Sequence, residues 1–400
     1  MIEEKGAVSR EVGVALAEHV RKLTGADIGI GVTGLAGPDG DGVHEVGTVF
    51  VTMAVEGKTY VRALTLGPKR TRSFIRRMSG NHAYDMMRRW LDFCGNRARE
   101  TRPQNQDNPW KEYLADQGFH FGEWCEPDVD NMVAMRKNAM EGAPAVATAY
   151  YFKSASLLSR IAGILGKSGD AEKYAAVAEN AKKAWRFTCT KDGRIESDRQ
   201  CDYVRPVAFG LLTGDEAQTA ADDLDRLVAQ NGYRLNTGFL STPDLCRVLA
   251  DHGHADTAYR LLLNEECPGW LYTVSKGATT SWENWLGIDQ KNHPKDSLNH
   301  YAMGACVSWL YSHCAGIRPL EPGFEEILIK PMPGGTLTEA KAEYRSVVGS
   351  ICSHWRVEDG VFLLTVSTPE GRKVRVELPD GRSEEFSGGT ASFRCLLDRA

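Results

Sequence analysis

The spacing of apolar residues changes along this chain, and this change most constrains the fold. Between residues 143 and 263, apolar side chains recur at helical spacing in paired stretches separated by Gly-containing turns. After Pro319 they alternate instead, in short runs bounded by turns such as Glu358-Asp359-Gly360. Because helices and strands bury their apolar faces in different layers, we predict an all-α domain followed by an antiparallel β-sandwich domain.

The predicted helices of the middle segment pair as hairpins. The pairs are residues 143–165 with 170–187, 204–212 with 215–230, and 242–251 with 255–263. Repeated helical hairpins with long Trp-rich and Gly-rich loops are typical of a toroid of helices whose loop end opens to a ligand.

A small α/β pattern precedes the helices. Its predicted elements are one helix and three strands, at residues 9–23, 27–32, 46–55 and 59–66, closed by a basic amphipathic helix at 73–91. The loop that starts with Thr33 and Gly34 is Gly-rich, and Arg70 lies nearby in the sequence. Such a loop lets backbone N–H groups approach a phosphate, although these glycines serve equally well as turn residues.

Composition marks the domain boundaries and limits the partners. The polar stretch 92–108 has the character of a junction, so we predict an α/β domain at 1–91, a helical domain at 109–318 and a β domain at 319–400. The net charge of -5 and the lack of basic runs give no reason to expect a nucleic-acid or membrane partner.

The cysteines and the N-terminus indicate a cytoplasmic protein. Ten cysteines occur singly without a C-x-x-C pair, which predicts reduced thiols and neither a zinc site nor another cofactor site. The N-terminus has no charged-then-apolar secretory pattern, and no apolar run approaches the ~20 residues that span a bilayer.

One loop carries the residues best suited to catalysis. The stretch from Gly277 to Gly304 places Glu283 between Trp282 and Trp285 and follows it with His300. A carboxylate flanked by indoles is suited to gripping a sugar ring and acting on its anomeric carbon. The alternative is that both indoles are packing residues and Glu283 is a solvated acid.

Residues from about Tyr113 to Ala400 resemble the C-terminal half of bacterial α-L-rhamnosidases. The resemblance rests on ordered strings, which are GFHFGEW at 118–124, ATAYYFKSASLLSRIAGILGK at 147–167, YRLNTGFLSTP at 233–243, GATTSWENW at 277–285, SLNHYAMG at 297–304 and AGIRPLEPGFEEILIKPMPGG at 315–335. It implies an (α/α)6 barrel, here with fewer helices than a complete ring, followed by a β-sandwich. It also implies an L-rhamnoside or a rhamnose-containing oligosaccharide as the substrate.

The resemblance further implies residue roles. Glu283 matches the general base of an inverting mechanism, His300 matches a sugar-contacting histidine, and Trp124 matches a tryptophan of the rhamnose pocket. The family's general acid lies in an Asp-Glu-Arg string followed by Gly-Trp, and this sequence contains no such string. Glu123, and after it Glu126 or Asp128, are the remaining candidates for the acid.

Residues 6 to about 91 resemble the C-terminal domain of CinA proteins, a nicotinamide-mononucleotide amidohydrolase domain. The matching strings are GAVSREVGVALAEHVRKLTGADIGIGVTGLAGPDG at 6–40 and VGTVFVTMA at 46–54. The resemblance assigns Thr33, Gly34 and Arg70 to a nucleotide pocket. The family's nucleophilic serine lies in an E-S-C-T-G-G string, which does not occur here.

These observations leave three hypotheses. The first is a rhamnosidase-like glycoside hydrolase with Glu283 and Glu123 as its carboxyl pair and Trp124, Trp282, Trp285 and His300 around the sugar. The second is a catalytically inactive chimera of two truncated genes that binds L-rhamnosides weakly or does nothing. The third is nicotinamide-nucleotide chemistry in the N-terminal part.

Overall fold

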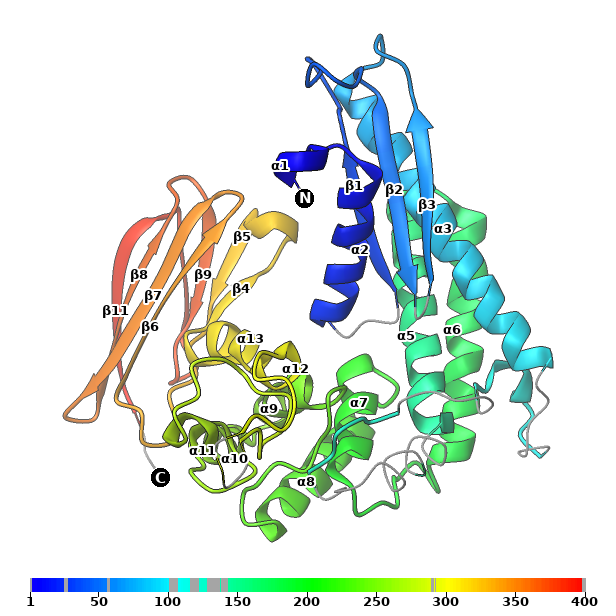
Figure 1. Cartoon of the computed structure of the whole chain (residues 1–400). Helices are drawn as coiled ribbons and strands as arrows, with labels where there is room; N and C mark the ends of the chain where they lie inside the picture. The colour runs from blue at the N-terminus through cyan, green and yellow to red at the C-terminus, as the bar shows by residue number, and fades with distance from the viewer. Residues whose placement is uncertain are drawn as a thin grey trace. The chain divides into compact units, whose positions relative to one another are not determined.

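The computed structural model describes residues 2–24, 28–55, 58–100, 107–115, 122–127, 137, 143–288, 291 and 293–397. The chain divides into two compact units, residues 1–196 with 209–213 and residues 197–208 with 214–400. Figure 1 labels their helices and strands.

The first unit begins with a three-stranded antiparallel sheet between helices (Figure 1). Its elements are α1 (Ile2–Lys5), α2 (Arg10–Thr24), β1 (Gly29–Gly34), β2 (Thr48–Val55), β3 (Lys58–Thr65) and α3 (Arg72–Glu100). In the sheet order β1-β2-β3, the central strand β2 is buried on both faces. Val51 and Met53 pack with Ile75 and Met86 of α3, while α2 lies against β1 and β2. The predicted α/β unit is confirmed.

Glycines allow α2 to lie directly on β1. A Cβ atom on Gly31 would stand 2.5 Å from the carbonyl oxygen of Gly13 and 2.7 Å from the backbone nitrogen of Ala17. The Thr52 hydroxyl on β2 fills the remaining space and donates to the Gly13 carbonyl at 2.6 Å. Gly31 therefore serves close helix–strand packing, where any side chain would force the two elements apart.

Helix α3 is packed on two sides. Besides the sheet, it contacts the hairpin of α5 (Ala143–Ile164) and α6 (Ser168–Cys189), where Tyr84 and Leu91 join a core with Leu158 and Tyr174. The helix continues to Glu100, so residues 92–100 of the predicted junction are helical. A short 3-10 turn, Lys111–Tyr113, also packs on α3 and α6.

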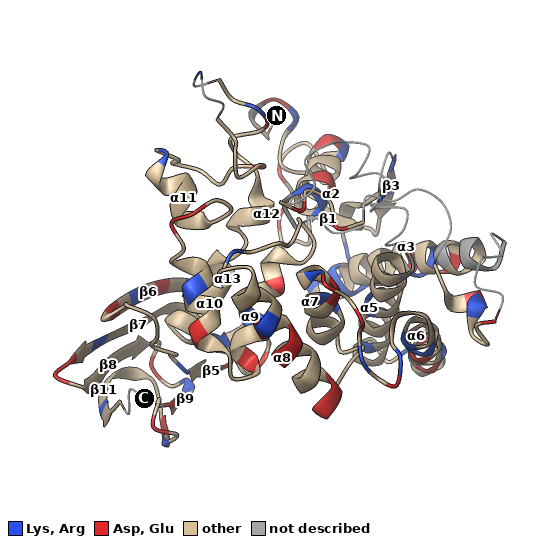
Figure 2. Ribbon diagram, turned by 90° about the horizontal axis from the view of Figure 1, so that it is seen from below, with Lys and Arg blue, Asp and Glu red and all other residues tan. Residues whose placement is uncertain are grey.

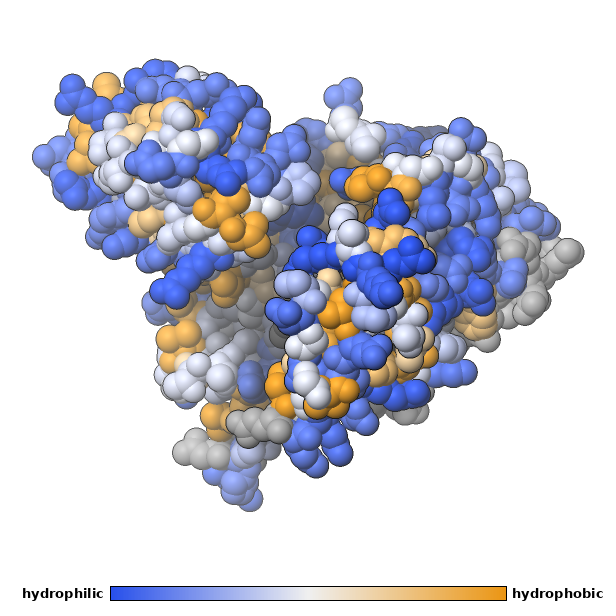
Figure 3. All heavy atoms as spheres, turned by 90° about the horizontal axis from the view of Figure 1, so that it is seen from above, coloured by the Kyte–Doolittle hydropathy of each residue, from blue (hydrophilic) through white to orange (hydrophobic). Residues whose placement is uncertain are grey.

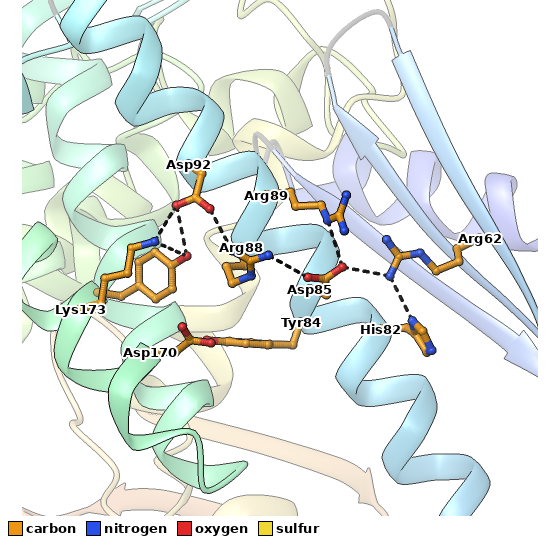
Figure 4. A network of polar contacts seen from close by, with 10 residues as sticks. Arg62, His82, Tyr84, Asp85, Arg88, Arg89, Asp92, Asp170 and Lys173 are labelled. Carbon is orange, nitrogen blue, oxygen red and sulfur yellow. Dashed lines mark hydrogen bonds and ion pairs between the residues drawn. The ribbon is translucent and has the colours of Figure 1, made fainter.

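A polar network follows α3 from β3 to α6 (Figure 4). At its β3 end, the Asp85 carboxylate accepts hydrogen bonds from Arg62, Arg88 and Arg89, each at 3.1 Å. Burial works against ionisation of this carboxyl, yet the hydrogen bonds and charges of the three guanidinium groups outweigh burial and lower the pKa of Asp85. Asp85 thus ties α3 to the sheet.

At the α6 end of the network, Asp92 accepts from Lys173 at 3.0 Å and from the Tyr174 hydroxyl at 3.3 Å (Figure 4). The Tyr84 hydroxyl donates to Asp170 at 3.0 Å. The carboxylates of α3 and α6 are therefore partnered across the helix interface, and the α/β part and the α5–α6 hairpin form one packed body.

The helices of the second unit precede its β domain. They are α7 (Gln200–Phe209, whose last residue belongs to the first unit), α8 (Asp215–Gln230), α9 (Thr242–Asp251), α10 (Ala255–Leu262), α11 (Trp270–Ser275), α12 (Tyr301–Gly304), α13 (Val307–Trp309) and the π-helical turn Leu310–Cys314. Apolar faces of α8, α9 and α10 bury Leu224, Leu245 and Leu261. The polar face of α8 is acidic (Figure 2), and His254 before α10 bonds Asp222 at 2.7 Å.

The β domain contains two four-stranded sheets (Figure 1). Their strands are β4 (Ile317–Pro319), β5 (Glu326–Ile329), β6 (Glu339–Ser346), β7 (Gly349–Glu358), β8 (Val361–Thr368), β9 (Lys373–Glu377), β10 (Ser383–Phe386) and β11 (Gly389–Leu396), with the turn Pro322–Phe324 after β4. Alternate residues such as Trp355, Phe362 and Val374 are fully buried, as the period of two predicts.

The pairing of these strands differs in one respect from the wholly antiparallel prediction. The sheet β11-β8-β7-β6 is antiparallel, but β5 pairs with β9 in parallel in the sheet β10-β9-β5-β4. Residue pairing over a long sequence separation leaves no mark on the apolar period of a strand, so the sequence pattern did not distinguish the two directions.

Surface apolar residues are dispersed on the face drawn in Figure 3, where hydrophobic groups alternate with hydrophilic ones. Val43 and Val347, both in loops, are 84% and 88% exposed. Single exposed apolar side chains are normal in folded proteins. Among the helices that the structure describes, none has the length and hydropathy of a membrane span.

Candidate active site

Two segments of the loop between α11 and α12 pair with each other. The backbone nitrogen of Glu283 donates to the Ser297 carbonyl at 2.9 Å, and that of His300 donates to the Ser281 carbonyl at 2.8 Å. These bonds bring the two residues singled out in the sequence onto adjacent stretches of backbone. The described parts of 276–300 are loop, as predicted.

Glu283 is half-buried, and its carboxylate has a backbone donor. The N–H of Ser297 donates to Oε2 of Glu283 at 3.2 Å. The loop therefore holds an oriented carboxylate that remains accessible to a small ligand or water.

The indoles beside Glu283 are packed. Trp282 and Trp285 are only 5% and 6% exposed. The edge of Trp282 lies over Gly287, where an added Cβ would stand 2.9 Å from the ring, and Trp285 meets Trp270 edge to face at 5.8 Å. This burial fits the packing alternative and shows how the loop holds its shape. Their role as walls of a sugar pocket remains a prediction.

His300 precedes α12 and caps it. Its Nδ1 accepts a hydrogen bond from the backbone nitrogen of Ala302 at 3.3 Å. The Phe239 ring stacks on the imidazole, with ring centroids 4.5 Å apart and planes at 29°. Phe239 lies in the string YRLNTGFLSTP but was not among the site residues expected from the sequence, because its contact with His300 spans 61 positions and no local pattern reveals it.

Glu123 and Trp124 belong to the first unit, whereas Glu283 and His300 belong to the second. Glu123 is 5% exposed and Glu126 is 7% exposed, and Trp124 is half-buried. Asp128, the third candidate acid, lies outside the described residues. Glu123 and Glu126 both stay candidates for the general acid.

The predicted nucleotide-binding residues have local structural partners. The Thr33 hydroxyl donates to the Ala7 carbonyl at 2.6 Å. Gly34 lies so close to β2 that a Cβ would stand 2.6 Å from the Thr48 carbonyl oxygen. Arg70 is exposed and its guanidinium lies 4.9 Å from the Phe74 ring centroid. Their role in binding a nucleotide remains a prediction.

A buried histidine connects α9 with the start of the β domain. His313 Nε2 lies 2.9 Å from an Asp251 oxygen, and Nδ1 lies 2.7 Å from the Ser312 hydroxyl. The Ser312 hydroxyl donates to the Ser308 carbonyl at 2.7 Å, so its proton is engaged within the helical turn. Burial lowers the pKa of His313 and outweighs the opposing bond with Asp251. We interpret this cluster as structural.

The described part of the chain contains no group of three or more His, Cys, Asp or Glu side chains arranged to hold a metal ion.

Comparison with known proteins gives the context of this loop. The model of the bacterial α-L-rhamnosidase six-hairpin glycosidase domain matches residues 78–314, more than half of the chain. The chain belongs to this family. The model of the bacterial α-L-rhamnosidase C-terminal domain matches residues 316–392, so the rhamnosidase resemblance and the multidomain fold are both confirmed.

Individual relatives agree with this assignment. An α-L-rhamnosidase of Streptomyces avermitilis is 38% identical over 58% of this chain, and one of Formosa agariphila is 30% identical over 78%. The alignments cover only 23% and 32% of those proteins, so the chain spans about a quarter to a third of their length.

Solved structures share the fold. The structure of the Streptomyces avermitilis rhamnosidase complexed with L-rhamnose matches 80% of this chain and 31% of that one, with a TM-score of 0.68 and 30% identity. The Aspergillus terreus rhamnosidase matches 80% of this chain and 37% of that one, with a TM-score of 0.69 and 26% identity.

The N-terminal resemblance is also confirmed. The CinA C-terminal domain model matches residues 1–91. A putative competence-damage inducible protein of Caldanaerobacter subterraneus is 45% identical over 23% of this chain and 22% of its own length. The CinA and rhamnosidase matches overlap at residues 78–91, within α3.

Proposed function

We propose that the chain is a glycoside-hydrolase module that binds terminal α-L-rhamnosides and hydrolyses them with inversion, with Glu283 as the general base. The observation that carries the proposal is the pairing of the two loop segments, one of which carries the hydrogen-bonded Glu283 carboxylate and the other His300. The L-rhamnose in the related Streptomyces avermitilis structure supports the choice of sugar.

The chemistry requires two carboxyl groups. Glu283 takes a proton from a water molecule whose oxygen bonds to the anomeric carbon, while the glycosidic C–O bond breaks. A protonated carboxyl on the opposite face gives its proton to the departing oxygen, and inverting enzymes hold the two groups roughly 6.5–9.5 Å apart. We propose Glu123 as the acid because it lies in the string GFHFGEW, which resembles the family's sequence.

Release of p-nitrophenol from its α-L-rhamnoside by the full-length protein tests this proposal. Glu283→Gln removes the base while keeping the size of the side chain, and we expect kcat to fall by roughly 10²–10⁴-fold. Glu123→Gln tests the acid, and the exposed Glu265→Gln in the same unit as Glu283 is the matched control. An unchanged rate in Glu283→Gln would contradict the proposal.

Calorimetry with L-rhamnose, combined with this assay, tests the alternative that the chain binds rhamnosides without hydrolysing them. If folded protein binds L-rhamnose in calorimetry yet releases no p-nitrophenol, the chain is a rhamnoside-binding module and no hydrolase. A loss of activity in Glu283→Gln but not in Glu123→Gln would indicate that Glu126 or Asp128, and not Glu123, is the general acid.

The CinA match at residues 1–91 favours a second candidate, binding of a nicotinamide nucleotide by the N-terminal part. Arg70 is exposed and cationic, so it is available to a phosphate, whereas Thr33 already donates to Ala7. Calorimetric titration with nicotinamide mononucleotide tests this candidate. We expect Arg70→Ala to weaken binding, and no heat of binding with the parent protein would reject it.

A further inference from the structure

Phe239 lies over His300, and both side chains are half-buried. Their ring centroids are 4.5 Å apart at an interplanar angle of 29°, so the phenyl covers one face of the imidazole. We propose that Phe239 is a positioning residue that fixes the plane of the His300 imidazole and so aims its Nε2–H at a hydroxyl group of the sugar. The hydrogen bond from His300 to the sugar in this proposal rests on the proposed function.

The other contacts of His300 determine which nitrogen carries the proton. Ala302 donates its backbone N–H to Nδ1, so Nδ1 is unprotonated in the neutral ring and the proton is on Nε2. The backbone of His300 is fixed by its bond to Ser281. A single bond of 3.3 Å to Nδ1 holds the ring weakly, and when the ring turns away from Ala302 the bond is lost and either nitrogen can carry the proton. Stacking opposes this rotation: the Phe239 ring lies nearer, with centroids 4.5 Å apart, and the Tyr301 ring also stacks on the imidazole, with centroids 5.9 Å apart.

Phe239 itself stands on a rigid turn. The Thr242 hydroxyl donates to the Gly238 carbonyl at 2.7 Å, and the Thr242 backbone nitrogen donates to the same carbonyl at 3.1 Å. Thr237 and Thr242 are 0% and 1% exposed, and their hydroxyl oxygens are 2.8 Å apart. Buried and bonded backbone on both sides of Phe239 is the kind of support that holds a site residue in place.

Stacking and space filling make different predictions. If Phe239 only fills volume, a leucine of similar volume suffices. If it orients the imidazole, a flat ring is required, and tyrosine replaces it while leucine does not. Phe239→Leu and Phe239→Tyr therefore separate the two roles, and Phe386→Leu, at another half-buried aromatic pair in the β domain, is the control. Thermal melting checks that each variant is folded.

The first measurement needs no ligand. Nitrogen-15 NMR of the His300 ring in the full-length protein reports the tautomer. We expect the Nε2–H form in the parent and in Phe239→Tyr, and a mixture of tautomers in Phe239→Leu. If Phe239→Leu keeps the parent's single tautomer, the proposal is overturned. This result stands whether or not the protein hydrolyses rhamnosides.

The second measurement is a double-mutant cycle on L-rhamnose affinity. We expect Phe239→Leu to weaken binding about tenfold, Phe239→Tyr less than about twofold, and Phe239→Leu to add nothing in a His300→Ala background. Full additivity of the two substitutions would contradict action through His300. If the parent binds no rhamnose, the proposed function fails, and the tautomer measurement alone decides the role of Phe239.

Discussion

Two hydrogen bonds join Glu283 to the backbone of Ser297. The Glu283 nitrogen donates to the Ser297 carbonyl at 2.9 Å, and the Ser297 nitrogen returns a bond to the Glu283 carboxylate at 3.2 Å. The side chain is thereby oriented by the segment that leads to His300. Any change that shifts one segment of the loop relative to the other should disturb the carboxylate.

Gly287→Ala tests how strongly the buried indole shapes this loop. The new methyl group would stand 2.9 Å from the Trp282 ring and 3.1 Å from the Asn284 carbonyl oxygen, so the ring or the loop must shift. We expect a loss of about 1–3 kcal/mol in the free energy of unfolding, together with a lower kcat for the rhamnoside. Chemical denaturation and the p-nitrophenol assay measure the two effects. Gly277→Ala, at a position of positive φ with open space around it, gives the cost of backbone strain alone for comparison.

Two glycine substitutions in the first unit should change the free energy of unfolding in opposite directions. Gly31→Ala places a methyl group against the backbone of Gly13 and Ala17, and we expect a loss of ~1–3 kcal/mol or more in the free energy of unfolding. Gly80 is exposed in helix α3 with no atom near its added Cβ, so Gly80→Ala should gain roughly 0.5–1 kcal/mol. Urea titrations of the two variants provide the comparison. Equal effects would mean that α2 does not pack on β1 as described.

The network along α3 should couple the CinA-like sheet to the rhamnosidase-like hairpin. Asp92→Asn weakens the bonds from Lys173, Tyr174 and Arg88, and Arg88 also bonds Asp85 at the sheet end of the network. We expect a modest loss of roughly 0.5–2 kcal/mol, because the site is partly exposed. Hydrogen exchange followed by mass spectrometry should show faster exchange in both the sheet and α6. Faster exchange in α6 alone would indicate that the two parts unfold independently.

Stability of the second unit should decline in mild acid because of His313. Burial lowers the pKa of His313, so the unfolded chain binds a proton at higher pH than the folded chain does. The stabilisation is therefore present above the unfolded value of ~6.5 and is lost as the pH falls below it. The pKa of Asp251 is also lowered, because its bond to His313 and the nearby Arg318 and Arg247 outweigh burial, and this contribution is lost only at lower pH.

The measurement is the melting temperature of the full chain between about pH 5 and pH 7.5, the window around the histidine value. His313→Gln should flatten the dependence in this window, while His293→Gln, an exposed histidine of the same unit, should leave it unchanged. A parent protein whose stability does not fall in this range would show that His313 accepts a proton without penalty.

The sequence by itself determined the local elements and most of the family relationship. Apolar spacing gave the helices from Ala143 to Leu262 to within a few residues at most ends, because the period of a buried face is a local property of the chain. It likewise placed the Glu283 loop, since polar residues, Pro294 and uneven apolar spacing exclude a regular helix.

The tertiary structure decided what depends on residues far apart in the sequence. Only folding shows that β5 and β9 pair in parallel, that Trp282 and Trp285 are buried, and that Phe239 stacks on His300. The continuation of α3 beyond Leu91 also needed the structure, because the polar residues 92–100 lack an apolar period and their helix extends from a segment packed against α5 and α6. Such contacts depend on which distant segments pack together, and the local pattern of a segment does not indicate the segments it will contact.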